Sequence, residues 1–395
     1  MQPSRRTPGH GGNLTWAATL AGCSPFDILD FSASINPLGP PPSAIAAIQS
    51  SLNDLRHYPD PGYIHLKQTL AQLHDLSPDW ILPGNGSAEL LTWASRELAD
   101  LNATHLLTPA FGDYLRALKA FNANIIPCPL PLTDKDDRSI GSTEIGLDRA
   151  LSDSLLPTPH SPLSTLLPIH PSTHPLPTGL LLNNPHNPTG KLFPRQSLLP
   201  LLEQYALVVI DEAFMDFLPE DEQQSLIDRV TEFPNLVILR SLTKFYSFPG
   251  LRFGYAIAHP DRLQRWQQWR DPWSVNTLAA AAAEAVVKDV AFQQKTLNWL
   301  PPARNQLYAG LAALPGLSPL PGAANYLLVH FRGSTIELQK TLLQRHKILI
   351  RDCNSFPELG DRYFRVAVRT ESENQRLLDA LVEVPPDVNA LSDAS

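Results

Sequence analysis

A lysine that could carry out covalent chemistry lies in segment 240–255, RSLTKFYSFPGLRFGY. Lys244 follows Ser241 by three residues and precedes Arg252 by eight. Its amine could form a Schiff base with a carbonyl-bearing cofactor, while the neighbouring hydroxyl and guanidinium could hold a phosphate group of that cofactor. Taken alone, the segment is equally compatible with a surface lysine in a basic loop, because short motifs often arise by chance. The other polar clusters of the chain must decide between these interpretations.

The elements predicted around this lysine alternate between strands and helices. Four apolar segments, at 105–108, 179–183, 207–210 and 236–239, are typical of buried strands, and each is followed by a polar or glycine-rich cluster. Helices are predicted between them, which favours an α/β fold with a doubly wound, mostly parallel sheet and helices on both faces. In such a sheet the ligand site lies outside the carboxyl ends of the strands.

The residues at those strand ends are candidates for the site. Phe111 follows the first strand, Asn187 follows the second within NNPHNPTG, and Asp211 ends the third. The glycine turn at 84–86 precedes a predicted helix that begins near Ser87, and the free N–H groups of a helix start attract anions. Glycine turns before helices are common, so this motif is weak on its own.

The order of elements predicts two lobes. We expect a large lobe at 50–275 that contains the sheet and a smaller α+β lobe at 276–384, with residues 1–49 packed against the smaller lobe. A segment rich in proline, serine and threonine, at about 127–178, is predicted to be an insert that is mostly loop, with a single helix inside it. Residues 385–395 are predicted to be a disordered tail.

Composition excludes several classes of function. The chain has 395 residues and a net charge of −8, with no run of basic residues, which argues against nucleic acid or an anionic membrane as a partner. No apolar stretch is long enough to span a membrane, and the first residues lack the apolar core of a secretory signal. The 3 cysteines are scattered, without metal-site or disulfide spacing, so we expect no metal and a cytoplasmic location.

The clusters GNGS, PAF, NPTG, DEAF and SLTK follow one another in this order, with an arginine eight residues after the lysine. This series resembles the class I/II aminotransferase family, the fold-type I pyridoxal-phosphate enzymes, over nearly the whole chain except the proline-rich segment and the tail. The resemblance implies pyridoxal 5′-phosphate bound to Lys244, with Asp211 at the pyridine nitrogen, Asn187 at O3′ and Phe111 against the ring. The implied residues around the cofactor phosphate are Gly86, Ser87, Ala88, Ser241, Thr243 and Arg252.

The resemblance also implies a second subunit and a substrate contact. Tyr58, in HYPDPG, matches a tyrosine that reaches the cofactor phosphate of the partner subunit, which implies a homodimer. Arg365, in YFRVAVR, matches an arginine that binds the substrate α-carboxylate through two hydrogen bonds. Phe214 of DEAF stands where many aminotransferases have a tyrosine whose hydroxyl helps to hold O3′.

Within the family, HGGN, DFSASINPLGPP, HYPDP, DEAFMDF and YFRVAVRT together are similar to the decarboxylases that act on L-threonine O-3-phosphate in cobalamin synthesis. The alternative is a histidinol-phosphate aminotransferase, which shares the cofactor residues. A remote alternative is a fold-type I domain without catalytic activity. A phosphorylated amino acid needs donors for its own phosphate, and the candidates are His10, Gly11, Gly12, Asn36 and Arg369.

Overall fold

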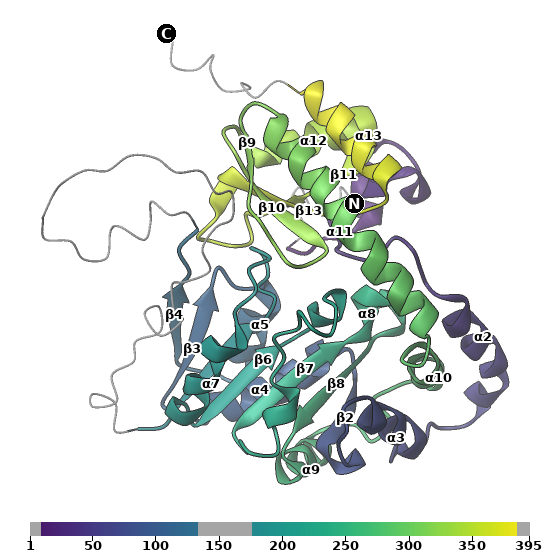
Figure 1. Cartoon of the computed structure of the whole chain (residues 1–395), viewed down its shortest axis with the longest axis vertical. Helices are drawn as coiled ribbons and strands as arrows, with labels where there is room; N and C mark the ends of the chain where they lie inside the picture. The colour runs from purple at the N-terminus through teal and green to yellow at the C-terminus, as the bar shows by residue number, and fades with distance from the viewer. Residues whose placement is uncertain (1–8, 133–175, 385–395) are drawn as a thin grey trace, which may run out of the picture.

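The computed structural model describes residues 9–132 and 176–384 of the chain. These residues form a large and a small lobe, joined by the long helix α11 (Val290–Ala313), which runs from one lobe to the other in Figure 1. Most of the proline-rich segment, with its expected helix, lies outside the described residues, and so does the expected C-terminal tail.

The large lobe is built on a seven-stranded sheet. In spatial order its strands are β2 (Ile81–Asn85), β8 (Phe253–Ala258), β7 (Leu236–Ser241), β6 (Leu207–Asp211), β5 (Thr178–Asn183), β3 (Ala103–Thr108) and β4 (Ile125–Pro129). The five strands from β7 to β4 are mutually parallel, whereas β8 runs antiparallel to both of its neighbours. The mostly parallel sheet expected from the sequence is therefore confirmed, and these five strands carry their carboxyl ends to one edge beside the start of β8.

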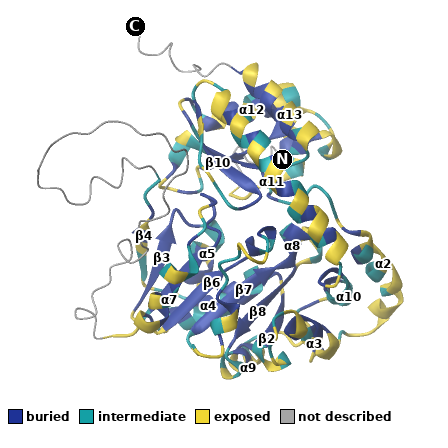
Figure 2. Ribbon diagram, in the orientation of Figure 1, coloured by how far each residue is buried: buried dark blue, intermediate teal, exposed yellow. Residues whose placement is uncertain are grey.

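Both faces of this sheet are buried. Successive side chains of a strand point to opposite faces, so a strand made of consecutive apolar residues contributes to a core on each face. In β6, Val208 and Ile210 join the core on one face, and Val209 joins the core on the other. Burying each such side chain contributes about 1.5–3 kcal/mol. The strands are accordingly dark blue in Figure 2, with exposed residues on the outer sides of the helices.

The helices lie in two layers around the sheet. Helices α4 (Ser87–Ala99), α5 (Gly112–Ala120) and α9 (Pro260–Trp269) bury residues in the core with Val209, and helices α3 (Ile64–Leu73), α7 (Arg195–Gln204) and α10 (Thr277–Val286) bury residues in the other core. Helix α10 packs against α3 and against α2 (Pro42–Ser50), so it belongs to the large lobe. The boundary expected at residue 276 therefore falls before a helix of the large lobe.

The small lobe contains a four-stranded antiparallel sheet. Its order is β12 (Arg351–Asp352), β13 (Tyr363–Ala367), β10 (Tyr326–Phe331) and β9 (Leu317–Pro319), and helices α12 (Thr335–His346) and α13 (Glu371–Val382) complete the lobe.

The N-terminal segment is divided between the lobes. Strand β1 (Leu29–Asp30) pairs in parallel with β11 (Ile348–Leu349), and α1 (Leu14–Ala21) packs on α12. Residues 14–30 thus pack with the small lobe as expected, whereas α2 packs on the large lobe. In Figure 1 this N-terminal part, coloured purple, lies within the small lobe.

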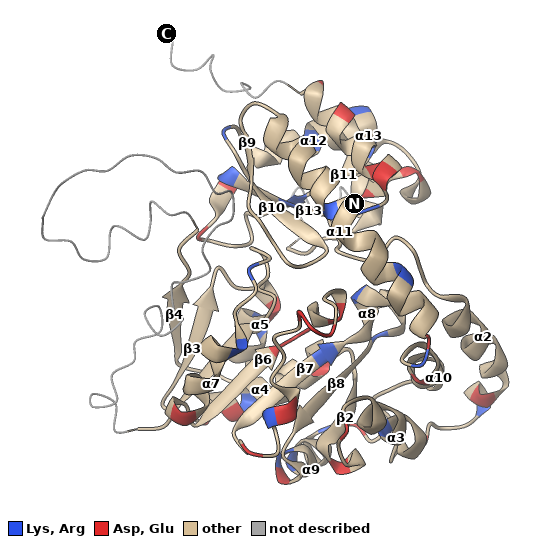
Figure 3. Ribbon diagram, in the orientation of Figure 1, with Lys and Arg blue, Asp and Glu red and all other residues tan. Residues whose placement is uncertain are grey.

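The described surface carries charges of both signs, which Figure 3 shows mixed over the outer helices while the strands are mostly uncharged. Within residues 9–132 and 176–384, no helix is both long and apolar enough to cross a membrane. The same residues contain no group of histidine, cysteine and acidic side chains placed to hold a metal ion.

Candidate active site

A cavity of about 420 Å³ lies between the strand ends of the large sheet and the small lobe. Both lobes and the N-terminal segment contribute to its lining. Its cations are Lys244, Arg252, Arg351 and Arg365, and its carboxylates are Asp113 and Asp211. The cavity is therefore positive within a chain of net charge −8, which favours anionic ligands.

Lys244 is positioned by the short helix α8 (Leu242–Phe245), which begins where β7 ends. Its Nζ donates to Ser241 Oγ at 3.3 Å and lies 6.0 Å from the centre of the Phe214 ring. Burial lowers the pKa of Lys244, the charge of Asp211 opposes that shift, and the Arg252 charge reinforces it. A lysine with a lowered pKa provides the neutral amine that attacks a carbonyl group.

Asp211 ends β6 at the bottom of the cavity and is 9% exposed. Its Oδ2 accepts a hydrogen bond from the Tyr114 hydroxyl at 2.9 Å, and its Oδ1 accepts one from the Ala213 backbone N–H at 2.9 Å. Burial raises the pKa of Asp211, while the charge of Lys244 and the Tyr114 hydrogen bond oppose the rise. A buried carboxylate of this kind gains from a cationic ligand group such as a protonated ring nitrogen.

The start of α4 and Arg252 form a cradle for an anion. Gly86 has a φ of 75°, and a Cβ there would lie 2.7 Å from Arg252 Nη2, so only glycine lets the arginine approach the turn. Ser87, Ala88 and Arg252 line the cavity. The free N–H groups of the helix start and the guanidinium are the donors that a phosphate group needs.

The remaining cofactor residues surround this cradle. Phe111 and Asn187 line the cavity, as expected. Ser241 and Thr243 are buried directly behind Lys244, and their hydroxyls are 2.8 Å apart. Ser241 accepts the hydrogen bond from Lys244, and neither Ser241 nor Thr243 lines the cavity.

Asn187 faces the cavity in a fixed orientation. Its Oδ1 accepts a hydrogen bond from Arg365 Nη1 at 2.6 Å. Because arginine can only donate, the amide oxygen must face it, which leaves the N–H groups of Asn187 as donors toward a ligand. Phe214 also lines the cavity, but it has no hydroxyl that could donate a second hydrogen bond to the ligand.

Two arginines approach the cavity from the small lobe. Arg365 on β13 and Arg351 on β12 are register partners in the antiparallel pair, and they are 9% and 6% exposed. Arg365 Nη2 donates to Ser32 O at 3.4 Å, and Arg351 Nη2 donates to Gly9 O at 2.6 Å and to Ser355 Oγ at 2.5 Å. Of these two arginines, the sequence motifs singled out Arg365 and did not single out Arg351, although both line the cavity.

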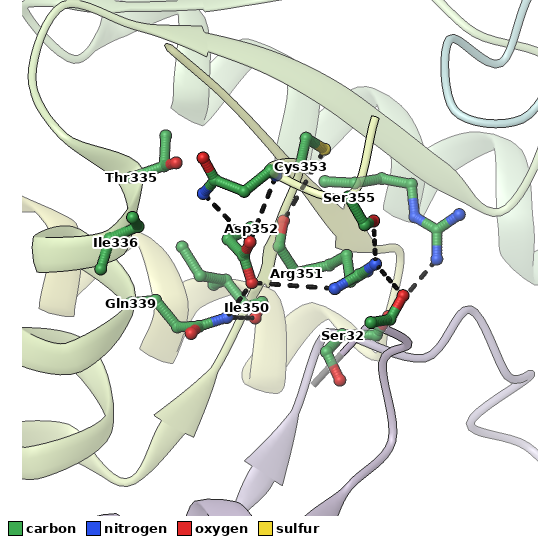
Figure 4. A network of polar contacts seen from close by, with 12 residues as sticks. Ser32, Thr335, Ile336, Gln339, Ile350, Arg351, Asp352, Cys353 and Ser355 are labelled. Carbon is green, nitrogen blue, oxygen red and sulfur yellow. Dashed lines mark hydrogen bonds and ion pairs between the residues drawn. The ribbon is translucent and has the colours of Figure 1, made fainter. Parts of the chain in front are cut away.

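A network of polar contacts holds the Arg351 side chain in place, as Figure 4 shows. Its Nη1 lies 3.7 Å from Asp352 Oδ2. Gln339 of α12 donates to that same oxygen at 3.2 Å and to Ile350 O at 2.7 Å. Asn354 donates to the other carboxylate oxygen from its backbone N–H at 3.2 Å. The buried carboxylate and helix α12 thus fix the strand that carries the arginine.

The HGGN segment closes the cavity next to these arginines. His10 and Gly11 line it, and the His10 ring meets the Phe111 ring edge-on, with centres 5.7 Å apart. A Cβ on Gly11 would lie 2.2 Å from Ser32 O, so only a glycine fits this close approach. Ser34 also lines the cavity, and its buried hydroxyl has no hydrogen-bond partner among residues 9–132 and 176–384.

Three residues proposed for the substrate phosphate are not brought to the cavity, and their contacts explain why. The backbone N–H of Gly12 donates to Ser32 Oγ at 2.8 Å. The amide of Asn36 donates to Phe245 O at 2.8 Å, in the buried interior.

Arg369 is the third of these residues. It donates to Asp30 O at 3.1 Å and to Glu373 of α13 at 2.8 Å. Its contacts tie β1 to α13, so Arg369 stabilises the small lobe.

Tyr58 does not line the cavity of its own chain. It is 78% exposed and stacks on Trp273, with ring centres 4.4 Å apart. Its expected role concerns a second subunit.

The sheet, the buried lysine beyond β7, the aspartate that ends β6 and the anion cradle together define a pyridoxal-phosphate enzyme of fold type I. The chain belongs to the aminotransferase class I and II family, whose model matches residues 27–381. It is 39% identical to the threonine-phosphate decarboxylase of Salmonella typhimurium over 95% of this chain and 96% of that protein. It is 29% identical to the histidinol-phosphate aminotransferase of Methylobacillus flagellatus over 95% of this chain and 93% of the relative.

Solved structures show the same fold. The histidinol-phosphate aminotransferase from Clostridium acetobutylicum superposes with a TM-score of 0.75 at 24% identity, over 90% of this chain and 98% of that one. The L-threonine-O-3-phosphate decarboxylase from Porphyromonas gingivalis gives a TM-score of 0.73 at 24% identity, over 89% and 98% of the two chains.

The residues fit pyridoxal 5′-phosphate, the cofactor of this family. The donors of Ser87, Ala88 and Arg252 suit its phosphate, Lys244 suits its aldehyde and Asp211 suits its ring nitrogen. When bound, the cofactor supplies an electron sink for bonds broken at the substrate Cα.

Proposed function

We propose that this enzyme decarboxylates L-threonine O-3-phosphate to (R)-1-amino-2-propanol O-2-phosphate and CO2, a step of cobalamin biosynthesis. The observation that carries the proposal is the pair Arg351 and Arg365, which reach one cavity from neighbouring strands, on the side opposite Asp211 and Lys244. The 39% identity to a threonine-phosphate decarboxylase supports it.

The two arginines match a small substrate with two anionic ends. Arg365, next to Asn187, would hold the α-carboxylate, and Arg351, next to Gly9 and His10, would hold the phosphate. Guanidinium groups bind both kinds of anion through paired hydrogen bonds. The N-terminal segment would close over the phosphate and exclude water from it.

Within this site, Arg365 orients the carboxylate and thereby selects the bond at Cα that breaks. Lys244 would return a proton to Cα after CO2 has left, because its amine lines the cavity and can act as a general acid. Burial lowers the pKa of Lys244, which favours release of that proton.

A histidinol-phosphate aminotransferase is the second candidate, because several such enzymes resemble the chain at 28–31% identity. Histidinol phosphate has a phosphate but no carboxylate, so it offers Arg365 no carboxylate to bind, whereas L-threonine O-3-phosphate has an anionic group for each of the two arginines. A domain without catalytic activity is disfavoured by the presence of Lys244 and Asp211.

Two assays test the assignment. Purified enzyme with pyridoxal phosphate is incubated with L-threonine O-3-phosphate, and released CO2 is measured. The enzyme is separately incubated with histidinol phosphate and 2-oxoglutarate, and glutamate is measured. We expect CO2 in the first assay and only trace glutamate in the second, whereas glutamate without CO2 would refute the decarboxylase.

We further propose that the enzyme is a homodimer in which Tyr58 serves the partner's cavity. The support is the exposure of Tyr58 and Trp273, flanked by Leu55 and Ile64, which are 56% and 57% exposed. Large exposed apolar side chains of this kind favour an interface.

Subunit mixing tests this arrangement. K244A and Y58A subunits, each inactive or impaired alone, should regain activity when mixed, since one site of the mixed dimer then has both groups. Sedimentation as a monomer, or mixing without any gain, would contradict the proposal.

A further inference from the structure

Tyr114 is a buried tyrosine that the proposed reaction does not use. It lies in the first turn of α5, three residues after Phe111, and is 2% exposed. Its hydroxyl donates to Asp211 Oδ2 at 2.9 Å. Helix α5 therefore meets the cofactor pocket at two places. Phe111, which precedes the helix, lines the pocket, and Tyr114 contacts the Asp211 carboxylate.

Tyr114 supplies one of the two hydrogen bonds that hold the Asp211 carboxylate. The other comes from the backbone N–H of Ala213 at 2.9 Å. The hydrogen bond from the Ala213 backbone fixes one oxygen of the Asp211 carboxylate, and it does not depend on the side chain at position 213. The orientation of the second oxygen therefore depends on the tyrosine hydroxyl.

The charge of Asp211 depends on its surroundings. The titratable groups that act on Asp211 or on its tyrosine partner are Lys244 on α8, Asp113 and Tyr114 on α5, and Tyr326 on β10. Burial raises the pKa of Asp211, and the Tyr114 hydrogen bond is one of the contacts that lower it again. Burial and the nearby Asp211 charge raise the pKa of Tyr114 well above its usual value, so the hydroxyl remains a donor.

We propose that Tyr114 is a positioning residue for the cofactor: its hydroxyl holds the Asp211 carboxylate in place and in its charged form, so that the carboxylate keeps the ring nitrogen protonated. Tyr114 acts on the nitrogen only through Asp211. The proposal concerns the cofactor and does not depend on which substrate the enzyme uses.

The test compares cofactors as well as variants. Wild-type and Y114F enzymes are stripped of cofactor and titrated with pyridoxal phosphate, and with an analogue in which carbon replaces the ring nitrogen. We expect Y114F to bind pyridoxal phosphate about tenfold more weakly than wild type, the lower end for one hydrogen bond to a charged group. The analogue should bind both proteins equally, because it has no protonated ring nitrogen for the Asp211 carboxylate to stabilise.

A matched control is Y255F. Tyr255 is also buried, at 1% exposure, and its hydroxyl makes one hydrogen bond, to His74 Nε2 at 2.8 Å, away from the cavity lining. This variant should bind both cofactors as wild type does. Circular dichroism and the melting temperature of the cofactor-free forms monitor folding, and Y114F keeps every carbon atom of the side chain.

Two further measurements separate a positioning role from general packing. With cofactor labelled at the ring nitrogen, the ¹⁵N chemical shift should move toward the unprotonated value in Y114F and stay at the protonated value in Y255F. In a D211N background, adding Y114F should cause no further loss of affinity. The proposal is overturned by an unchanged ¹⁵N shift, by an equal loss of affinity for both cofactors, or by a full Y114F effect in D211N.

Discussion

Arg351 should be the arginine that binds the substrate phosphate, and Arg369 should not be. The change to test is R351Q, with R369Q as its matched control. Both arginines are on the small lobe, and their side chains are largely buried, at 7% and 19% exposure. Only Arg351 lines the cavity.

The expected magnitude follows from these contacts. A hydrogen bond to a charged group contributes about 1.5–3 kcal/mol, so losing the contact to phosphate should lower kcat/KM for L-threonine O-3-phosphate by about 10- to 100-fold. The loss should appear mainly as a higher KM, because the phosphate is remote from the bond that breaks. R369Q removes the ion pair with Glu373 and the hydrogen bond to Asp30 O, so it should lower stability, and it should leave KM unchanged because Arg369 does not line the cavity.

The assay is CO2 release at several substrate concentrations, with inorganic phosphate as a competing anion. Inorganic phosphate should inhibit wild type and R369Q alike and should inhibit R351Q more weakly. Urea unfolding of each variant separates loss of binding from loss of structure. The argument fails if R369Q raises KM as much as R351Q, or if R351Q lowers kcat and leaves KM unchanged.

Three more changes test other parts of the structure. G11A should raise KM for the phosphorylated substrate about tenfold without changing cofactor affinity, because its Cβ would clash with Ser32 O and displace the segment from the cavity; titration with pyridoxal phosphate checks the second part. E212Q should lower the urea-unfolding free energy by about 1.5–3 kcal/mol, because Arg240, 3% exposed, loses its charged partner at 3.0 Å and keeps its second ion pair, with Asp216. His186 is 0% exposed and burial lowers its pKa to about 3, against about 6.5 when unfolded, so stability should fall as pH drops below 6.5. H186N should remove about 2 kcal/mol of the stability difference between pH 7 and pH 5, measured by urea unfolding at both values.

The cofactor side of the site could be predicted from the sequence because its signals are local. An apolar strand that ends in a polar residue places that residue at the sheet edge, as at Asp211 and Ser241. Lys244 lies one helical turn after the end of β7, and Arg252 lies in the loop that follows. Their approach to the same cavity can therefore be predicted without knowing how distant segments pair. The parallel sheet follows from the same alternation of strands and helices.

The substrate side could not be predicted, because it depends on pairing between distant segments. Arg369 stands four residues after Arg365, but β13 ends at Ala367, so alternation along the strand does not place the two side chains on one side. Arg351 faces the cavity through its register with Arg365, and one strand alone carries no information about register. Helix α10 was likewise assigned to the wrong side of the lobe boundary, because its partner α2 lies more than 200 residues earlier.

The residues that would recognise the substrate are held together by contacts between the small lobe and the N-terminal segment. Strand β1 pairs with β11, and the Ala367 backbone N–H donates to Phe31 O at 2.8 Å, so the N-terminal segment is fixed to the small lobe. The carbonyls of that segment accept hydrogen bonds from Arg351 and Arg365. The same segment continues to the lysine helix α8, where the Asn36 backbone N–H donates to Lys244 O at 3.1 Å. We infer that residues 9–34 and 351–365 govern which anions the cavity holds, whereas Lys244 and Asp211 would bind the cofactor whichever reaction follows.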